Sequence, residues 1–366
     1  MRTSKVCRAE PSHAEQAQVA ACFPLTSQPI SAVRLSSALA TNCSLIASAM
    51  SLPQELQSFL DDQSPDVADS SIVVRGILSH LDELGPSSIA DFVAADDFRL
   101  IKALASAVVR APGSEGSQQF MQTIGALAGL TGGVVWQNVP LEFISACFCA
   151  VFAEDSAESL ALLSTSCVVE IVRFCCSDNA APQFAADVLK LMEPLLPTLM
   201  SKLDSDSERV VSSCLSVLFA LHSSSIATHL RAVVRSHPNI TFLCSSAVKA
   251  LNRAESSMEI EEICGLACAF LSAEDTAEFF YPADLEVFMQ ILVREIGLRL
   301  ADSSESSDSA NTTLTLLVAI EVALRTPWHK SCKFLSDDAF KAIKKCCVSS
   351  HEEVSFVAHQ IISSHF

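Results

Sequence analysis

From residue 54 onward, apolar side chains recur every three or four positions in one stretch after another. In residues 96–110, for example, Leu100, Leu104 and Val108 fall on one helical face. This spacing is typical of helices that bury one side, whereas a half-buried strand would alternate at every second position. Breaks that contain Gly, Pro, Ser or Asp separate the stretches. The pattern therefore predicts an all-α chain.

The predicted helices are joined by short breaks. They span residues 54–60, 69–84, 96–110, 120–130, 139–152, 157–176, 182–203, 208–221, 226–235, 240–252, 258–271, 285–300 and 313–324. Pro194 and Pro197 fall inside the 182–203 helix, and proline in a helix interior predicts a kink. Residues 300–311 are acidic and rich in Ser, which predicts a flexible loop.

Helices of this length with short breaks suggest hairpins stacked one on the next. Their units recur loosely at about 35 to 45 residues, close to the armadillo and HEAT range. No consensus repeat is legible in them. A compact helical bundle is the alternative, but many helices without one dominant hydrophobic centre favour an armadillo/HEAT-like α-solenoid.

Two parts are expected along the chain. Residues 1–49 are rich in Ser, Ala and Thr, and we interpret them as a disordered leader or an over-extended N-terminus. Glu10 and Glu15 argue against an organelle transit peptide, and no secretory signal or membrane-spanning run is visible. Met50 would be a natural start of one helical domain, residues 50–366. The expected location is the cytoplasm.

Charge and cysteine content narrow the class of protein. The chain has 24 Lys and Arg against 42 Asp and Glu, a net charge of −18. Such a charge repels nucleic acid and anionic membranes, so neither partner is expected. The 15 Cys are an odd number and mostly lie in apolar helical runs. They are interpreted as small buried side chains in a reducing compartment.

No pattern for catalysis or metal binding was found in the sequence. The phosphate-binding loop, the nucleophile elbow and the zinc-protease motif are all missing. Cys264 and Cys268 share a helix face, but buried core thiols are the better interpretation. Glu259, Glu261 and Glu262 are interpreted as acids that favour a helix N-terminus. The expectation is a protein that is not an enzyme and has no catalytic residue, cofactor or metal.

One basic helical face departs from the overall acidity. Lys341, Lys344 and Lys345 are spaced so that they share one side of a helix. Two interpretations stay open: a solvated helix C-terminus, which the helix dipole favours, or a patch that binds a partner.

The stretch from Glu278 to Trp328 has the most specific pattern. An aromatic triplet comes first, followed by an acid, an apolar helix with an embedded arginine, and a second helix with a marked end. The residues that carry this pattern are Phe279, Phe280, Tyr281, Asp284, Arg294, Arg325, Thr326, Pro327 and Trp328.

This order of motifs resembles the C-terminal part of the family of the NCK-interacting protein with SH3 domain, also called WISH/DIP, and its fungal actin-patch relatives. The resemblance covers about residues 276–345. Pro282 and Ala283 stand where the family usually has Thr-Asn. No SH3 domain or proline-rich tail, which animal members have, is recognisable in this sequence.

The resemblance implies an armadillo-like domain that binds the actin-related protein 2/3 complex and promotes nucleation of unbranched actin filaments. Such filaments seed branched networks at endocytic, cortical actin patches, so the expected partners are that complex and actin. The alternative from sequence is a helical-repeat scaffold for a different protein. The motif residues are expected to build the fold first, with the Lys341 face as a candidate contact surface.

Overall fold

The computed structural model describes residues 59–60, 70–83, 86–153, 157–301, 307–332 and 336–366. The chain divides into two units, Met1–Met50 and Ser51–Phe366, and every described residue lies in the second. The predicted leader, nearly all of the 54–60 helix and the middle of the predicted acidic loop therefore lie outside the described residues. Within the described ranges every regular element is a helix, which confirms the all-α prediction.

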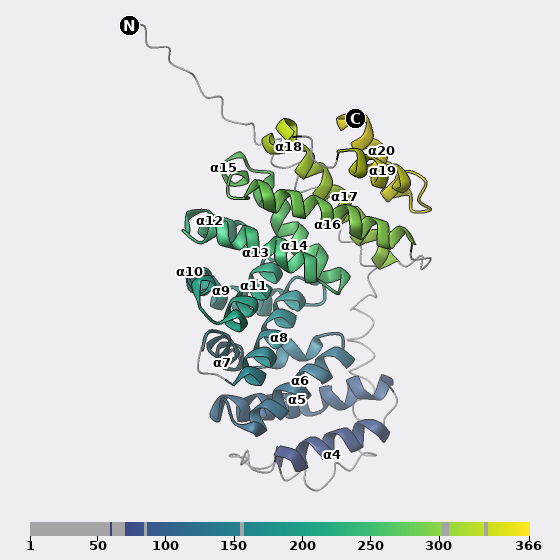
Figure 1. Ribbon diagram of the computed structural model, residues 1–366. Coiled ribbons are helices and arrows are strands. Elements are labelled where there is room, and N and C mark those ends of the chain that lie inside the picture. The colour runs from purple at the N-terminus through teal and green to yellow at the C-terminus, as the bar shows by residue number, and fades with distance from the viewer. Residues whose placement is uncertain (1–58, 61–69, 84–85, 154–156, 302–306, 333–335) are drawn as a thin grey trace. The chain divides into compact units, whose positions relative to one another are not determined.

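The helices follow one another in chain order from α4 to α20 (Figure 1). They are α4 (Ser70–Glu83), α5 (Pro86–Arg110), α6 (Glu115–Leu130), η2 (Val134–Asn138), α7 (Leu141–Phe152), α8 (Glu158–Cys175), α9 (Pro182–Met192), η3 (Glu193–Leu195), α10 (Leu196–Ser201), η4 (Lys202–Asp204), α11 (Glu208–His222), α12 (Ala227–Ser236), α13 (Ile240–Arg253), α14 (Ser257–Leu271), α15 (Glu274–Ala277), α16 (Pro282–Ala301), α17 (Ser307–Arg325), α18 (Pro327–Cys332), α19 (Ser336–Cys346) and α20 (Glu352–His365).

The helices form two layers with a shared core. One layer runs through α4, α6, α8, α11, α14, α17 and α20, each packed on the next. The other runs through α5, α7 and α9, is continued by α10 and α12, and then passes through α13, α16 and α19. Buried apolar side chains between the layers form one continuous cluster from Val73 in α4 to Ile361 in α20.

The second half of the stack is built from three-helix units. Each unit has a short helix followed by two longer ones: α12–α13–α14, α15–α16–α17 and α18–α19–α20. Hydrogen bonds between α16 and the preceding unit join residues 39 to 42 positions apart in the sequence. This offset agrees with the predicted repeat length, and the fold is an armadillo-like α-solenoid.

The bounds of several helices differ from the sequence predictions. The predicted 182–203 helix is divided into α9, η3, α10 and η4, with Pro194 in η3 and Pro197 in α10, so the prolines interrupt the regular helix as predicted. Helix α5 begins ten positions before the predicted residue 96, at Pro86. Helix α16 ends at Ala301 and α17 begins at Ser307, so both ends of the predicted 300–311 loop are helical.

Candidate functional site

The aromatic triplet of the motif, residues 279–281, comes directly before the first residue of α16. Phe280 is buried in the core, and Phe279 is half-buried and packs against it. Tyr281 is 58% exposed, so its ring is open to solvent. Pro282 is the first residue of α16, a position that tolerates proline because the N–H there has no helical partner. Two aromatic side chains thus anchor this helix start and the third faces outward.

Asp284 ties the first turn of α16 to the preceding unit. Its carboxylate accepts a hydrogen bond from the hydroxyl of Ser245 in α13. A carboxylate in the first turn is also favoured by the partial positive charge of the helix N-terminus. Asp284 therefore stabilises the start of α16 both within the helix and through its contact with α13.

Arg294 connects the same two helices further along α16. Its Nη1 donates to Oδ1 of Asn252 in α13 over 2.9 Å. Its Nε and Nη2 donate to Oε1 of Glu295 over 3.1 and 2.8 Å. The bonds to Glu295, on the same helix, hold the guanidinium in place, and the bond to Asn252 joins α16 to α13.

The end of α17 turns directly into α18. Arg325 is exposed and pairs with Glu321 one turn earlier. Thr326 is buried, and its hydroxyl donates to the carbonyl of Ala323 over 2.7 Å and accepts from the N–H of His329 at 3.3 Å. It therefore closes one helix and opens the next. Pro327 is the first residue of α18, and Trp328 packs half-buried against the core.

The three lysines of the predicted basic face lie on α19, which packs against α16. All three are exposed. Lys341 pairs with Asp338 at 3.1 Å, and the Lys344 ammonium lies 5.9 Å from the centre of the Phe340 ring. The structure thus brings the lysines onto the neighbour of the motif helix.

The acids at the start of α14 have more than one role. Glu259 forms a capping box with Ser256, as an acid near a helix N-terminus should. Glu261 instead accepts a hydrogen bond from Thr312 in α17 at 2.7 Å. Only Glu259 lies in the first turn of α14, so the interpretation as N-terminal acids is wrong for Glu261 and Glu262, which lie beyond that turn and bind other helices.

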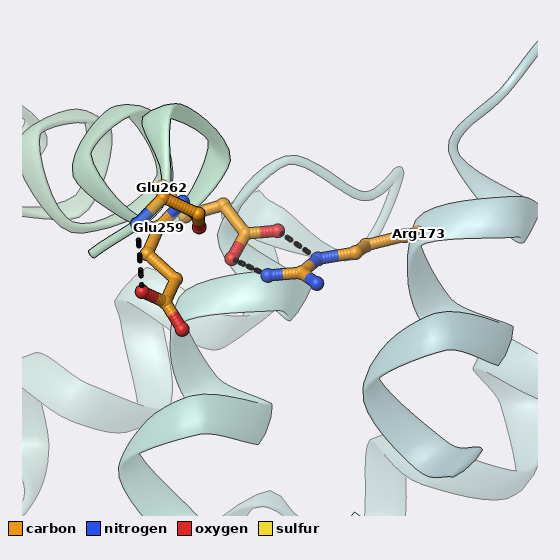
Figure 2. A network of polar contacts seen from close by, with 4 residues as sticks. Arg173, Glu259 and Glu262 are labelled. Carbon is orange, nitrogen blue, oxygen red and sulfur yellow. Dashed lines mark hydrogen bonds and ion pairs between the residues drawn. The ribbon is translucent and has the colours of Figure 1, made fainter. Parts of the chain in front are cut away.

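Glu262 binds Arg173 in α8, across the intervening helix α11. Figure 2 shows the guanidinium facing the carboxylate in a fork. Nε of Arg173 donates to Oε1 of Glu262 over 2.7 Å, and Nη2 donates to Oε2 over 2.8 Å. The hydrogen bonds that Arg173 donates to Glu262 raise the pKa of Arg173, and the charges of Glu259 and Glu170 add to the effect. Sequence reasoning missed this bridge because its two partners lie 89 positions apart.

Four helices in this half of the molecule carry charged side chains of one sign only. In the layer that contains α5, α7 and α9, helices α12 and α13 carry arginine or lysine and have no acid. In the other layer, α14 carries three glutamates and α20 carries two, and neither helix has a lysine or arginine. Helices α16 and α19, in the same layer as α12 and α13, carry both acids and cations.

The thiols of this region are chemically quiet. Cys264 and Cys268 are buried in α14, and burial raises the pKa of both, to about 12 for Cys268. A neutral thiol is a poor nucleophile and a poor metal ligand. In the part of the chain that the structure describes, no group of three or more His, Cys, Asp or Glu side chains is placed to hold a metal ion. None of the described helices has the length and apolarity to cross a membrane.

The chain is similar to designed repeat proteins and, in one segment, to a natural domain. A designed armadillo repeat protein, YIII(Dq)4CqI, matches with a TM-score of 0.44 and 14% identity over 73% of this chain and 100% of its own. A second designed armadillo repeat protein, in complex with the peptide (KR)4, matches with a TM-score of 0.40 and 15% identity over 73% and 99%. Among curated proteins, none matches the chain. Residues 207–331, which run from the N-cap of α11 into α18, are similar to the leucine-rich domain of SPIN90/Ldb17.

Proposed function

We propose that this chain is a non-enzymatic, armadillo-like activator that binds the actin-related protein 2/3 complex and promotes nucleation of unbranched actin filaments at cortical patches in the cytoplasm. One observation carries the proposal: the stretch similar to the SPIN90/Ldb17 leucine-rich domain contains the whole motif from Phe279 to Trp328. A domain of that family is consistent with an actin-related role. The complex itself, the unbranched product and the location are our extension.

A rigid solenoid suits an activator that selects one state of its partner. A ligand shifts an equilibrium only by the difference in its affinity for the two states. A surface held in place before binding loses little binding energy in ordering, and its fixed shape can fit one state of the partner better than the other. The bonds from Asp284 and Arg294 to α13, and from Glu261 to Thr312, hold α13, α14, α16 and α17 in this way.

The test is actin assembly with the purified complex, without preformed filaments and without a WASP-type activator. We expect faster assembly of pyrene-labelled actin and linear filaments under fluorescence microscopy. The immobilised chain should also retain the complex from a purified solution. No acceleration and no retention would show that the proposal is wrong and would favour a scaffold for a different partner.

A point substitution separates contact from fold within the motif. Tyr281→Ser removes an exposed ring and leaves the buried Phe280 in place. We expect it to reduce the assembly rate by at least about fivefold, which corresponds to less binding free energy than a typical interface hot spot contributes. The control is Leu162→Ser, which removes an exposed apolar side chain from α8, outside residues 207–331. Equal activity of the two variants would exclude Tyr281 as a contact.

A further inference from the structure

One ion pair in the stack skips a helix. Helix α11 packs against α8 on one side and against α14 on the other, and the Arg173–Glu262 bridge joins α8 directly to α14 (Figure 2). In a solenoid each unit usually contacts only its neighbours, so the angle between units is set by separate packing contacts. A bond from the first helix of three to the third makes the two contacts of α11 depend on each other.

The bridge also crosses the boundary of the segment that is similar to the SPIN90/Ldb17 domain. Arg173 lies before residue 207, where that segment begins, and Glu262 lies within it. The fork therefore ties the described helices up to α8 to the helices from α11 onward. Two parallel hydrogen bonds suit this role, because they fix the direction of the contact as well as its length.

Arg173 has a second possible acceptor on its own helix. Glu170 lies three positions earlier in α8, a spacing at which two helical side chains are neighbours. Its side chain is partly buried, and the one hydrogen bond found for it in the described part of the chain comes from Ser166 at 3.5 Å, which is long. Burial raises the pKa of Glu170, and the opposing effects of Ser166 and Arg173 are smaller. A closer guanidinium would therefore stabilise this carboxylate.

The other acids near Arg173 are held differently. Oε2 of Glu259 accepts from the backbone N–H groups of Glu255 and Ser256, at 3.2 and 3.4 Å, in the capping box of α14. The Glu262 side chain is 11% exposed, so losing its cation is costly while α8, α11 and α14 stay packed. The bridge to Glu262 is therefore the arrangement of the packed stack, and Glu170 is the acceptor left in reserve.

We propose that Arg173 is a releasable strap, which ties α8 to α14 in the closed stack and transfers to Glu170 when α14 moves away from α8. The transfer keeps the guanidinium paired in both arrangements, and the separation exposes Glu262 to water. Opening thus leaves no buried charge without a partner. Two discrete arrangements, in place of a continuous bend, are what a binding partner needs in order to select one of them. The inference concerns the stack itself and does not depend on the proposed function.

Hydrogen exchange with mass spectrometry on the full chain tests the strap. Glu262→Gln removes the acceptor on α14 and should speed amide exchange at the end of α8 and the start of α14 by about tenfold. Glu170→Gln removes the acceptor of the open arrangement and should slow exchange in the same two segments by about twofold, as expected for one helical ion pair. A static bridge would respond to the first change and not to the second.

Matched variants separate the strap from simpler effects. Removing a desolvated carboxylate would by itself stabilise α8, so Glu170→Gln is also made in an Arg173→Gln background. There it should have no effect, because no guanidinium remains to transfer. Glu158→Gln removes an exposed acid from the first turn of the same helix and should leave exchange in α14 unchanged. Exchange in α5 and α20, which lie outside the strap, should match the parent in every variant.

Four outcomes would overturn the proposal. Glu262→Gln leaves exchange unchanged, Glu170→Gln fails to slow it, or Glu170→Gln slows it equally in the absence of Arg173. The fourth is a loss of protection in α5 and α20 together with α14 in Glu262→Gln, because the chain would then open as one unit and not at the strap.

Discussion

At the scale of single residues, His222 at the end of α11 couples the fold to pH. Burial, with a smaller effect of Arg231, lowers the pKa of His222 to about 4. The unfolded chain, with an ordinary histidine pKa near 6.5, therefore binds more protons between those values, and stability falls as pH drops through this window. We expect His222→Gln to remove about 2 kcal/mol of that loss between pH 7 and pH 4.5. Urea unfolding at both pH values measures it, and identical losses in parent and variant would contradict it.

Gly133 is a second position where a small change, the addition of a Cβ atom, should affect stability. Its φ is +85°, and a Cβ there would lie 2.6 Å from the ring of Phe174. Gly132 beside it also has a positive φ, +62°, with open space around its Cβ position. Gly132→Ala should cost about 1 kcal/mol of unfolding free energy from backbone strain alone, and Gly133→Ala about 3 because a buried ring must also move. Thermal unfolding of both variants tests the difference, and equal costs would exclude the ring contact as its source.

At the scale of elements, the Arg173–Glu262 bridge joins α8 to α14 over α11. Its fork geometry and partial burial predict a coupling of about 1 to 2 kcal/mol in a double-mutant cycle of Arg173→Ala and Glu262→Ala. The matched pair Arg253 and Glu208 lies 3.7 Å apart with side chains 76% and 90% exposed, so its cycle should give a coupling near zero. Urea unfolding measures both. Equal couplings would show that the bridge does not brace the stack.

The same elements show what could be predicted from sequence. The start of α11 was placed correctly and its end within a residue, because Ser207 caps the helix and the apolar period is regular. The fold class followed from repetition of that signal. The bond from Ser245 to Asp284 and the fork on Glu262 could not be predicted, because each depends on how distant helices pack. Phe280 is buried and its neighbour Tyr281 is exposed. Which of the two is buried depends on the exact residue at which α16 begins, and the sequence does not give that residue.

At the scale of the whole molecule, a stack whose units touch mainly their neighbours should lose stability locally. Phe143 in α7 is fully buried, and α7 packs on α5, α8, α9 and α11. Ile320 in α17 is also fully buried, and α17 packs on α14, α16, α18 and α20. Each change to Ala should cost about 2 to 5 kcal/mol, yet in a solenoid the loss of amide protection should be greatest in the helices around it. Hydrogen exchange with mass spectrometry compares the two variants. If each variant loses amide protection mainly in its own half, the two halves open separately, and a partner could order one end of the stack without the other. If both variants lose protection uniformly, the chain opens as one cooperative unit.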